Sequence, residues 1–251
     1  MKLIKKIVLV GHNNSGSHKI ATAIIEKFPE VNFMIVETTG IYYNKSFAKS
    51  IIKLVKESSI RFCAWRFYEL LKFKLKGESL KKLARANNCK YISTCDINSS
   101  LTIKTISDFQ PDILSSLYTM HIYKGEVLSI AKYGSITAHP SKIPAYRGLE
   151  VFFWQLANNE TESAVSIFEI TPKIDEGEIY WCKSCLIDKD ETVESLYEKI
   201  TNLACNGLTS VIKSIDNGEN ASYISKEKSS YFPMPTRGAV RKFLADKKRF
   251  F

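Results

Sequence analysis

The sequence predicts an α/β fold, with a mostly parallel twisted sheet and helices on both faces. Residues 5–10 form an apolar β-type run, residues 11–16 a glycine turn, and residues 17–28 have helical spacing. A second β-type run follows at residues 31–36. This strand–helix–strand order is typical of a parallel sheet, because neighbouring parallel strands need a crossover connection.

The rest of the chain continues the alternation. We expect short strands at residues 89–93, 112–117 and 135–138, and helices at residues 99–109, 125–131 and 149–158. Residues 165–170 and 178–187 alternate apolar and polar positions, which favours an antiparallel pair. Residues 192–215 predict a long amphipathic helix that begins at a cap formed by Asp190 or Thr192.

Residues 46–87 have helical periodicity and carry many lysines and aromatics. The simplest interpretation is one or two helices with a stripe that faces the core, and the alternative is a face for a partner or a membrane. The stripe consists of Phe62, Trp65, Phe67, Tyr68, Leu70, Leu71 and Phe73.

Composition limits the class of protein. Of the 251 residues 45% are hydrophobic, so a packed core is feasible. No apolar run reaches the roughly 18–20 residues that span a bilayer. The apolar run at residues 7–10 is too short for a signal peptide, so we expect a cytoplasmic protein. The net charge of +10 fits a lysine-rich surface, a phosphorylated or nucleotide-linked partner or, less well, nucleic acid.

The cysteines and the first glycine turn give weak signals. Cys182 and Cys185 form the one C-x-x-C motif, on a predicted strand where positions three apart face opposite sides. We therefore expect reduced thiols and no metal site. The turn at residues 11–16 lacks the G-x-G-x-x-G dinucleotide pattern, and we expect His12 and His18 to be solvent-exposed turn residues.

The strongest chemical signal is a histidine followed by an acidic turn. His139 ends the apolar run at residues 135–138, and the Pro- and Ser-containing loop 140–148 follows it. Asp175 lies in a second turn, read IDEG. A histidine titrates near neutral pH and a carboxylate can orient it or stabilise its charged form, so the two residues suit proton transfer. A core histidine and a plain turn aspartate are the structural alternatives.

Two motifs then resemble those of a known family. Residues 137–148 read TAHPSKIPAYRG, and a strand at 165–168 precedes IDEGEI at 174–179. They are similar to the Asn-x-His-Pro-Ser-x-Leu-Pro-x-Tyr-Arg-Gly and Asp-x-Gly-x-Ile signatures of the formyltransferases, which use 10-formyltetrahydrofolate. The resemblance covers about residues 96–209 and implies the family's Rossmann-like fold and N-formyltransferase activity without a metal.

The resemblance also implies roles for residues. His139 and Asp175 would be catalytic, with Thr137 at the position of the family's asparagine. The family's folate-binding segments correspond here to Met120, His121, Ile122, Tyr123, Ile170, Ile174 and Asp175. The acceptor would lie near Ser141, Tyr146, Arg147 and Asn98.

Thr137 departs from the signature, in which an asparagine amide donates to the developing oxyanion. Loss of one such donor costs roughly 3–4 kcal/mol of barrier. The open alternatives are that Thr137 acts as a weaker donor, that another group replaces it, or that the protein is a slow or inactive folate- or nucleotide-binding relative.

The layout is most similar to that of sugar N-formyltransferases. We expect a catalytic domain at residues 1–215 and a C-terminal extension at 216–251, packed on it or on a partner subunit in a homodimer. The expected acceptor is a small primary amine, most simply on a nucleotide-linked aminosugar used for surface polysaccharide. A purine precursor remains an alternative acceptor, and nucleic acid is a weaker partner.

Overall fold

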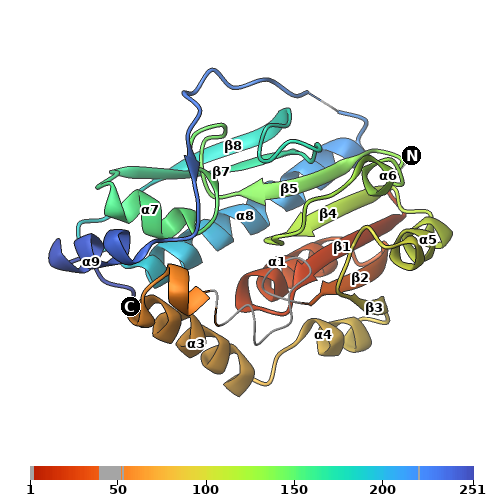
Figure 1. Ribbon diagram of the computed structural model, residues 1–251. Helices are drawn as coiled ribbons and strands as arrows, with labels where there is room; N and C mark the ends of the chain where they lie inside the picture. The colour runs from red at the N-terminus through yellow and green to blue at the C-terminus, as the bar shows by residue number, and fades with distance from the viewer. Residues whose placement is uncertain (1–2, 40–51, 53, 220) are drawn as a thin grey trace.

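The computed structural model describes all residues except 1–2, 40–51, 53 and 220 (Figure 1). Its main sheet has seven strands in the order β3-β2-β1-β4-β5-β7-β8. The first five in chain order pair in parallel, and β7 and β8 complete the sheet as an antiparallel pair. The predictions of a mostly parallel sheet and of this antiparallel pair are both confirmed. The strands are β1 (Lys6–His12), β2 (Asn32–Thr38), β3 (Lys90–Thr94), β4 (Ile113–Leu117), β5 (Ser135–His139), β7 (Glu162–Glu169) and β8 (Ile179–Leu186).

Helices cover both faces of the sheet, because strand residues alternate between two apolar layers (Figure 1). Ile7 and Leu9 of β1 point into the larger layer, whereas Val8 and Val10 point into the smaller one. The larger layer contains α1 (Ser15–Lys27), α3 (Ile60–Leu75), α4 (Leu80–Ala86), α7 (Val151–Ala157), α8 (Val193–Asp216) and α9 (Arg237–Ala245). The smaller layer contains α5 (Ser100–Phe109) and α6 (Gly125–Leu128).

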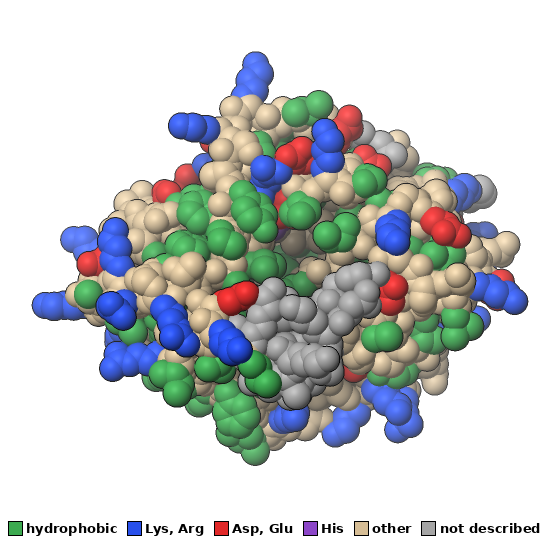
Figure 2. All heavy atoms as spheres, in the orientation of Figure 1, with side chains coloured by type: hydrophobic (Ala, Val, Ile, Leu, Met, Phe, Trp, Pro, Cys, Tyr) green, Lys and Arg blue, Asp and Glu red, His purple; other side chains and the backbone are tan. Residues whose placement is uncertain are grey.

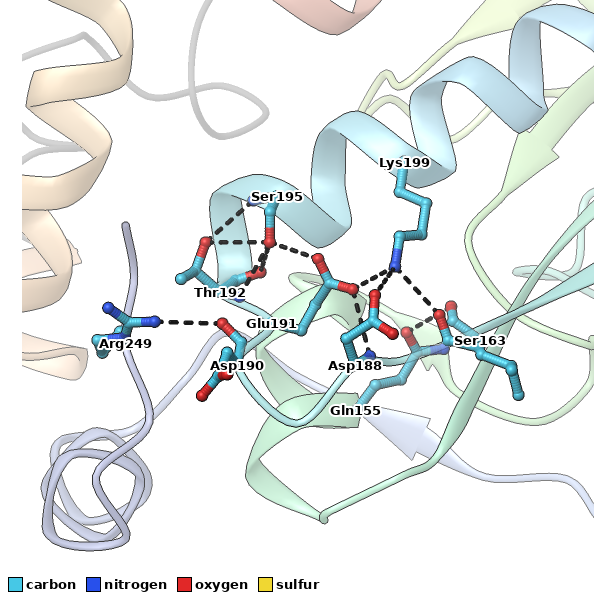
Figure 3. Close-up of polar contacts among 10 residues, drawn as sticks. Gln155, Ser163, Asp188, Asp190, Glu191, Thr192, Ser195, Lys199 and Arg249 are labelled. Atoms are coloured by element: carbon cyan, nitrogen blue, oxygen red, sulfur yellow. Dashed lines mark hydrogen bonds and ion pairs between the residues drawn. The ribbon is translucent and has the colours of Figure 1, made fainter.

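The long helix α8 begins at a reciprocal cap. Thr192 Oγ1 accepts from the Ser195 N–H at 3.1 Å, and Ser195 Oγ accepts from the Thr192 N–H at 3.0 Å. Figure 3 shows Lys199 reaching back to Asp188, at 2.8 Å, and to Glu191. Of the two predicted caps, Asp190 and Thr192, the structure uses Thr192. These contacts fix the position at which α8 begins.

The aromatic stripe on α3 divides into two faces. Phe62, Trp65 and Phe73 are buried, as predicted, whereas Phe67 is 68% exposed. Tyr68, Leu70 and Leu71 are exposed as well. Part of the predicted helical stretch, residues 46–51 and 53, lies outside the described residues. The core-facing prediction is therefore confirmed for three of its seven positions.

The C-terminal segment packs on the same chain. The short strand β9 (Tyr231–Phe232) pairs in parallel with β6 (Arg147–Gly148), which belongs to the loop after His139. Downstream, Val240, Phe243 and Phe250 are buried in the larger apolar layer. Residues 231–250 thus support the loop from one side and the helical layer from the other.

The six cysteines are free thiols. Cys182 packs beside Ile143 and Ile179, whereas Cys185 packs against the larger layer, so the two face opposite sides of β8 as predicted. Among the described residues, no helix combines the length and the apolar character needed to cross a bilayer.

Candidate active site

A cavity of about 230 Å³ lies at the carboxyl ends of β1, β4 and β5. In the view of Figure 2, the surface has a hollow near its middle that is bordered by hydrophobic side chains. The cavity is lined by Thr137, His139 and Asp175 and, on its other side, by residues of α3 and α7. Open parallel sheets bring strand ends together at this edge, so residues far apart in sequence meet here.

His139 is held as one tautomer. Its side chain is buried, and its Nε2 lies 2.7 Å from the carbonyl oxygen of Tyr146. A carbonyl can only accept, so this contact assigns the proton of the neutral ring to Nε2. Nδ1 then carries the lone pair, 3.6 Å from Asp175 Oδ1. The ring can therefore accept a proton at Nδ1, where Asp175 would stabilise the positive charge.

Asp175 is fixed by backbone contacts. Its Oδ2 accepts from the Gly148 N–H at 3.0 Å, and its φ of 51° places it in the left-handed region. Gly148 has φ of 104°, and a Cβ there would collide with the Phe232 carbonyl, so glycine is required. Arg147 pairs with Glu176, which ties the same turn to the loop of Asp175.

Thr137 lines the cavity, but its hydroxyl is already in use. Thr137 Oγ1 donates to the Ser116 carbonyl oxygen at 3.0 Å. A hydroxyl has one hydrogen to donate. In this rotamer, Thr137 therefore has no hydrogen left for an oxyanion.

Buried side chains brace the loop after His139. Gln155 Nε2 donates to the Pro140 carbonyl at 3.0 Å, and Ser163 Oγ donates to Gln155 Oε1 at 2.8 Å (Figure 3). Ser166 Oγ donates to the Ser141 carbonyl at 2.7 Å. These contacts fix the backbone on which His139 depends, and the sequence motifs did not predict them.

None of the four residues predicted to lie near the acceptor is among those that line this cavity. Ser141 donates within its loop, to the Ala145 carbonyl at 2.5 Å, and Arg147 is engaged by Glu176. Tyr146 donates to Glu160 at 2.5 Å. Asn98 donates to the Ile122 carbonyl at 2.9 Å and accepts from the Lys124 N–H at 2.8 Å, so it holds the predicted folate segment. These hydrogen bonds hold the side chains within their loops, and their contact with an acceptor stays a prediction.

The predicted folate residues form two groups. Met120 and Asp175 line the cavity, and Ile122 and Ile174 are 60% and 45% exposed. Exposed apolar side chains suit contact with a flat, partly apolar ligand. In contrast, Tyr123 is buried in the smaller apolar layer and Ile170 packs against it, so these two shape the segments from behind.

The turn histidines are not the solvent-exposed residues that the sequence suggested. His12 is half-buried in the cavity wall, where its Nδ1 lies 2.8 Å from the Thr38 carbonyl, and burial lowers its pKa. His121 lies beside it with ring centroids 5.8 Å apart, and burial also lowers the pKa of His121. His18 is half-buried against Phe73. His12 ends β1, and the carboxyl end of β1 lies at the same edge of the sheet as His139. This position in the sequence could have predicted that His12 lines the cavity.

A charged cluster that the sequence did not predict forms the opposite wall. Arg66 Nη1 lies 2.8 Å from Glu69 Oε2, and Arg66 Nε lies 3.7 Å from Glu150 Oε1. Burial raises the pKa of Glu69 to about 7. Helical spacing could have placed Arg66 and Glu69 on the buried side of α3, since they lie between Phe62 and Phe73 in steps of three and four.

No group of three or more His, Cys, Asp or Glu side chains is arranged to hold a metal ion within the described residues.

Solved structures show the same fold. WlaRD, a sugar 3N-formyl transferase solved in the presence of dTDP and 5-N-formyl-THF, has a TM-score of 0.62 at 20% identity, over 92% of this chain and 70% of that one. The N-formyltransferase from Helicobacter canadensis, in complex with folinic acid and dTDP-3-aminofucose, gives the same score and identity over 92% and 71%. Glycinamide ribonucleotide transformylase 1 from Symbiobacterium toebii gives 0.62 at 15% identity, over 88% and 94%. At these identities the likeness concerns the fold.

Sequence comparison identifies the family. A methionyl-tRNA formyltransferase from Ehrlichia ruminantium (strain Gardel) is 33% identical over 128 residues, which are 48% of this chain and 42% of that protein. The chain thus matches less than half the length of this curated relative. The family model described as formyl transferase matches residues 80–212, just over half of the chain and including both His139 and Asp175. This chain belongs to the formyltransferase family.

Proposed function

We propose that this protein transfers a formyl group from 10-formyltetrahydrofolate to a primary amine, with His139 and Asp175 as its catalytic residues. The observation that carries the proposal is the fixed tautomer of His139, with Nδ1 3.6 Å from Asp175 Oδ1, in a pair whose two residues line the cavity. The donor supplies the activated formyl carbon, and the residues of this chain orient the two reactants and move protons.

The geometry supports a role for each atom of the pair. As the amine nitrogen bonds to the formyl carbon, His139 Nδ1 takes a proton from that nitrogen. The resulting imidazolium is stabilised by Asp175, which the Gly148 N–H keeps in place. The same Nδ1–H can then protonate the departing nitrogen of the donor, so the ring ends as it began.

The negative charge that develops on the formyl oxygen needs a hydrogen-bond donor. Since Thr137 donates to Ser116, we infer that protonated His139 supplies this donor. The engaged hydroxyl also favours a second candidate, a folate-binding relative with slow or no turnover.

The acceptor that we propose is a nucleotide-linked aminosugar, used in the synthesis of surface polysaccharide by a cytoplasmic enzyme. Structures of WlaRD with dTDP and of the Helicobacter canadensis protein with dTDP-3-aminofucose support this choice. The Symbiobacterium toebii structure supports a purine precursor as the alternative. We further propose that residues 1–215 form the catalytic domain, with 216–251 as its extension, in a monomer or a homodimer.

Calorimetric titration with 5-formyltetrahydrofolate, a stable analogue of the donor, tests the folate site. We expect binding by the native protein and weaker binding by Asp175→Ala. An absence of binding by folded protein would show that only the scaffold is shared. Product formation with a panel of nucleotide aminosugars then separates a working transferase from a non-catalytic folate binder.

A further inference from the structure

Helix α3 forms one wall of the cavity. It spans Ile60–Leu75, outside the family match at residues 80–212. Trp65, Arg66, Glu69 and Phe73 of this helix all line the cavity that contains His139. Whatever α3 contributes to recognition is therefore additional to the shared formyl-transfer residues.

Charge in this cavity is unequally distributed. Among the described residues that line it, Arg66 is the only lysine or arginine, whereas Glu69, Glu150 and Asp175 contribute three carboxylates. Asp175 faces His139, which leaves Arg66 to balance both glutamates. The described lining of the cavity is therefore net negative, in contrast to the net charge of +10 of the whole chain.

The backbone places Glu150 in this wall at some cost. Glu150 has φ of 52°, a left-handed conformation that is unfavourable for a residue with a Cβ. It stands two residues after Gly148, whose N–H holds Asp175. Gly148 and Glu150 thus belong to one turn, which holds Asp175 through the Gly148 N–H and carries Glu150 into the wall that it forms with α3.

Glu69 also lacks a full counter-charge. Burial raises its pKa to about 7, and the neighbouring carboxylates Glu150 and Glu194 act in the same direction, against the opposing effect of Arg66. Lys72, the nearest lysine on α3, is paired with Glu194. Tyr197 of α8 also interacts with Glu69. Its hydroxyl is neutral near pH 7, because burial raises the pKa of Tyr197 to about 12. A positively charged group inside the cavity would provide the counter-charge that Glu69 lacks.

We propose that Glu69 and Glu150 bind the amino group of the acceptor as its ammonium ion, and that they make this transferase selective for basic amines. The inference rests on the proposed function and specifies which end of the acceptor enters. A phosphate would be repelled by the carboxylates, so any diphosphate lies outside the cavity. Before attack, the ammonium passes one proton to a carboxylate, which leaves a neutral amine with its lone pair and a carboxylic acid; no other reactant is needed.

The test uses two probes that differ in one group, D-glucosamine and D-glucose, titrated by ligand-observed NMR near neutral pH. We expect wild-type protein to bind glucosamine about tenfold more tightly than glucose, the ratio that one charge-assisted hydrogen bond supplies. Glu150→Gln and Glu69→Gln should each reduce the ratio to about twofold. Arg66→Gln should raise it, because the competing cation is gone.

Controls separate charge from structure. Glu26→Gln removes the same charge from an exposed position on α1, outside the cavity, and should leave the ratio unchanged. Thermal unfolding checks that each variant is folded. A wild-type protein that shows no preference for the amine, whether it binds both sugars or neither, overturns the proposal, and so does a preference that survives both glutamate substitutions. Binding of 5-formyltetrahydrofolate is measured separately, so failure of this proposal is distinguishable from failure of the proposed function.

Discussion

The two walls of the cavity are held in place by different kinds of contact. On one wall, His139 and Asp175 are fixed by backbone groups, the Tyr146 carbonyl and the Gly148 N–H. On the other, α3 is held by aromatic packing and by ion pairs between side chains. The comparison teaches that the first wall depends on a fixed backbone, with glycine required at position 148, whereas the second depends on its own side chains and can be rebuilt by substitutions. We expect chemistry to depend on the first wall and acceptor choice on the second.

The largest expected effect is on the backbone-fixed wall. His139→Ala removes the group that accepts and returns the proton, so the rate of formyl transfer should fall by about a thousandfold. The measurement is product formation at saturating donor, with Asp175→Asn as a companion that keeps the shape of the side chain. Activity within a few fold of wild type in His139→Ala would exclude the assigned role.

Removal of an aromatic ring should destabilise the side-chain-fixed wall. Phe62 is 0% exposed and its ring contacts Trp65, Phe153 and Phe250, so Phe62→Ala should cost about 3–5 kcal/mol of unfolding free energy. Phe67→Ala is the matched control on the exposed face of the same helix and should change it by less than about 0.5 kcal/mol. Denaturant unfolding measures both, and equal effects would contradict the two-faced description of α3.

The same wall should respond to pH. The pKa of Glu69 is raised from its ordinary 4.5 to about 7, so its neutral form is favoured in the folded state. The associated stability is present below 4.5 and is lost as the pH rises through about 7, a change of about 3 kcal/mol. Glu69→Gln cannot ionise, so its stability relative to wild type should increase from about pH 5 to about pH 8. Parallel stability curves for the two proteins would refute the raised pKa.

A smaller effect on the transfer rate is expected at Thr137, on the wall that carries His139. Thr137→Asn introduces an amide with two hydrogens, one for the Ser116 carbonyl and one for the cavity. We expect the transfer rate to rise about tenfold, a part of what one oxyanion donor is worth. Thr137→Val is the control without a donor and should leave the rate close to that of wild type. An unchanged rate in the asparagine variant would mean that protonated His139 suffices.

Features that depend on residues close together in the sequence could be predicted, whereas features that depend on long-range packing could not. The alternation of strands and helices and the cap at Thr192 follow from local patterns. The meeting of His139 with Asp175 was predicted from two motifs, although Asp175 lies in the loop between the antiparallel strands β7 and β8. Glu69 and Glu150 are 81 positions apart and meet only through the packing of α3 on α7, for which no local pattern exists. The contacts that hold Ser141, Tyr146 and Arg147 within their loops were not predicted either, because a motif names its residues without saying where their side chains turn.

The pairing of β6 with β9 has a consequence for how the protein matures on the ribosome. Gly148 holds Asp175, but Gly148 itself is placed by residues 230–232, which donate and accept across the small sheet. The contact between His139 and Asp175 is therefore not yet supported when these two residues emerge from the exit tunnel. Synthesis must continue past Phe232 before this loop closes, so a nascent chain acquires its sheet early and its catalytic geometry late.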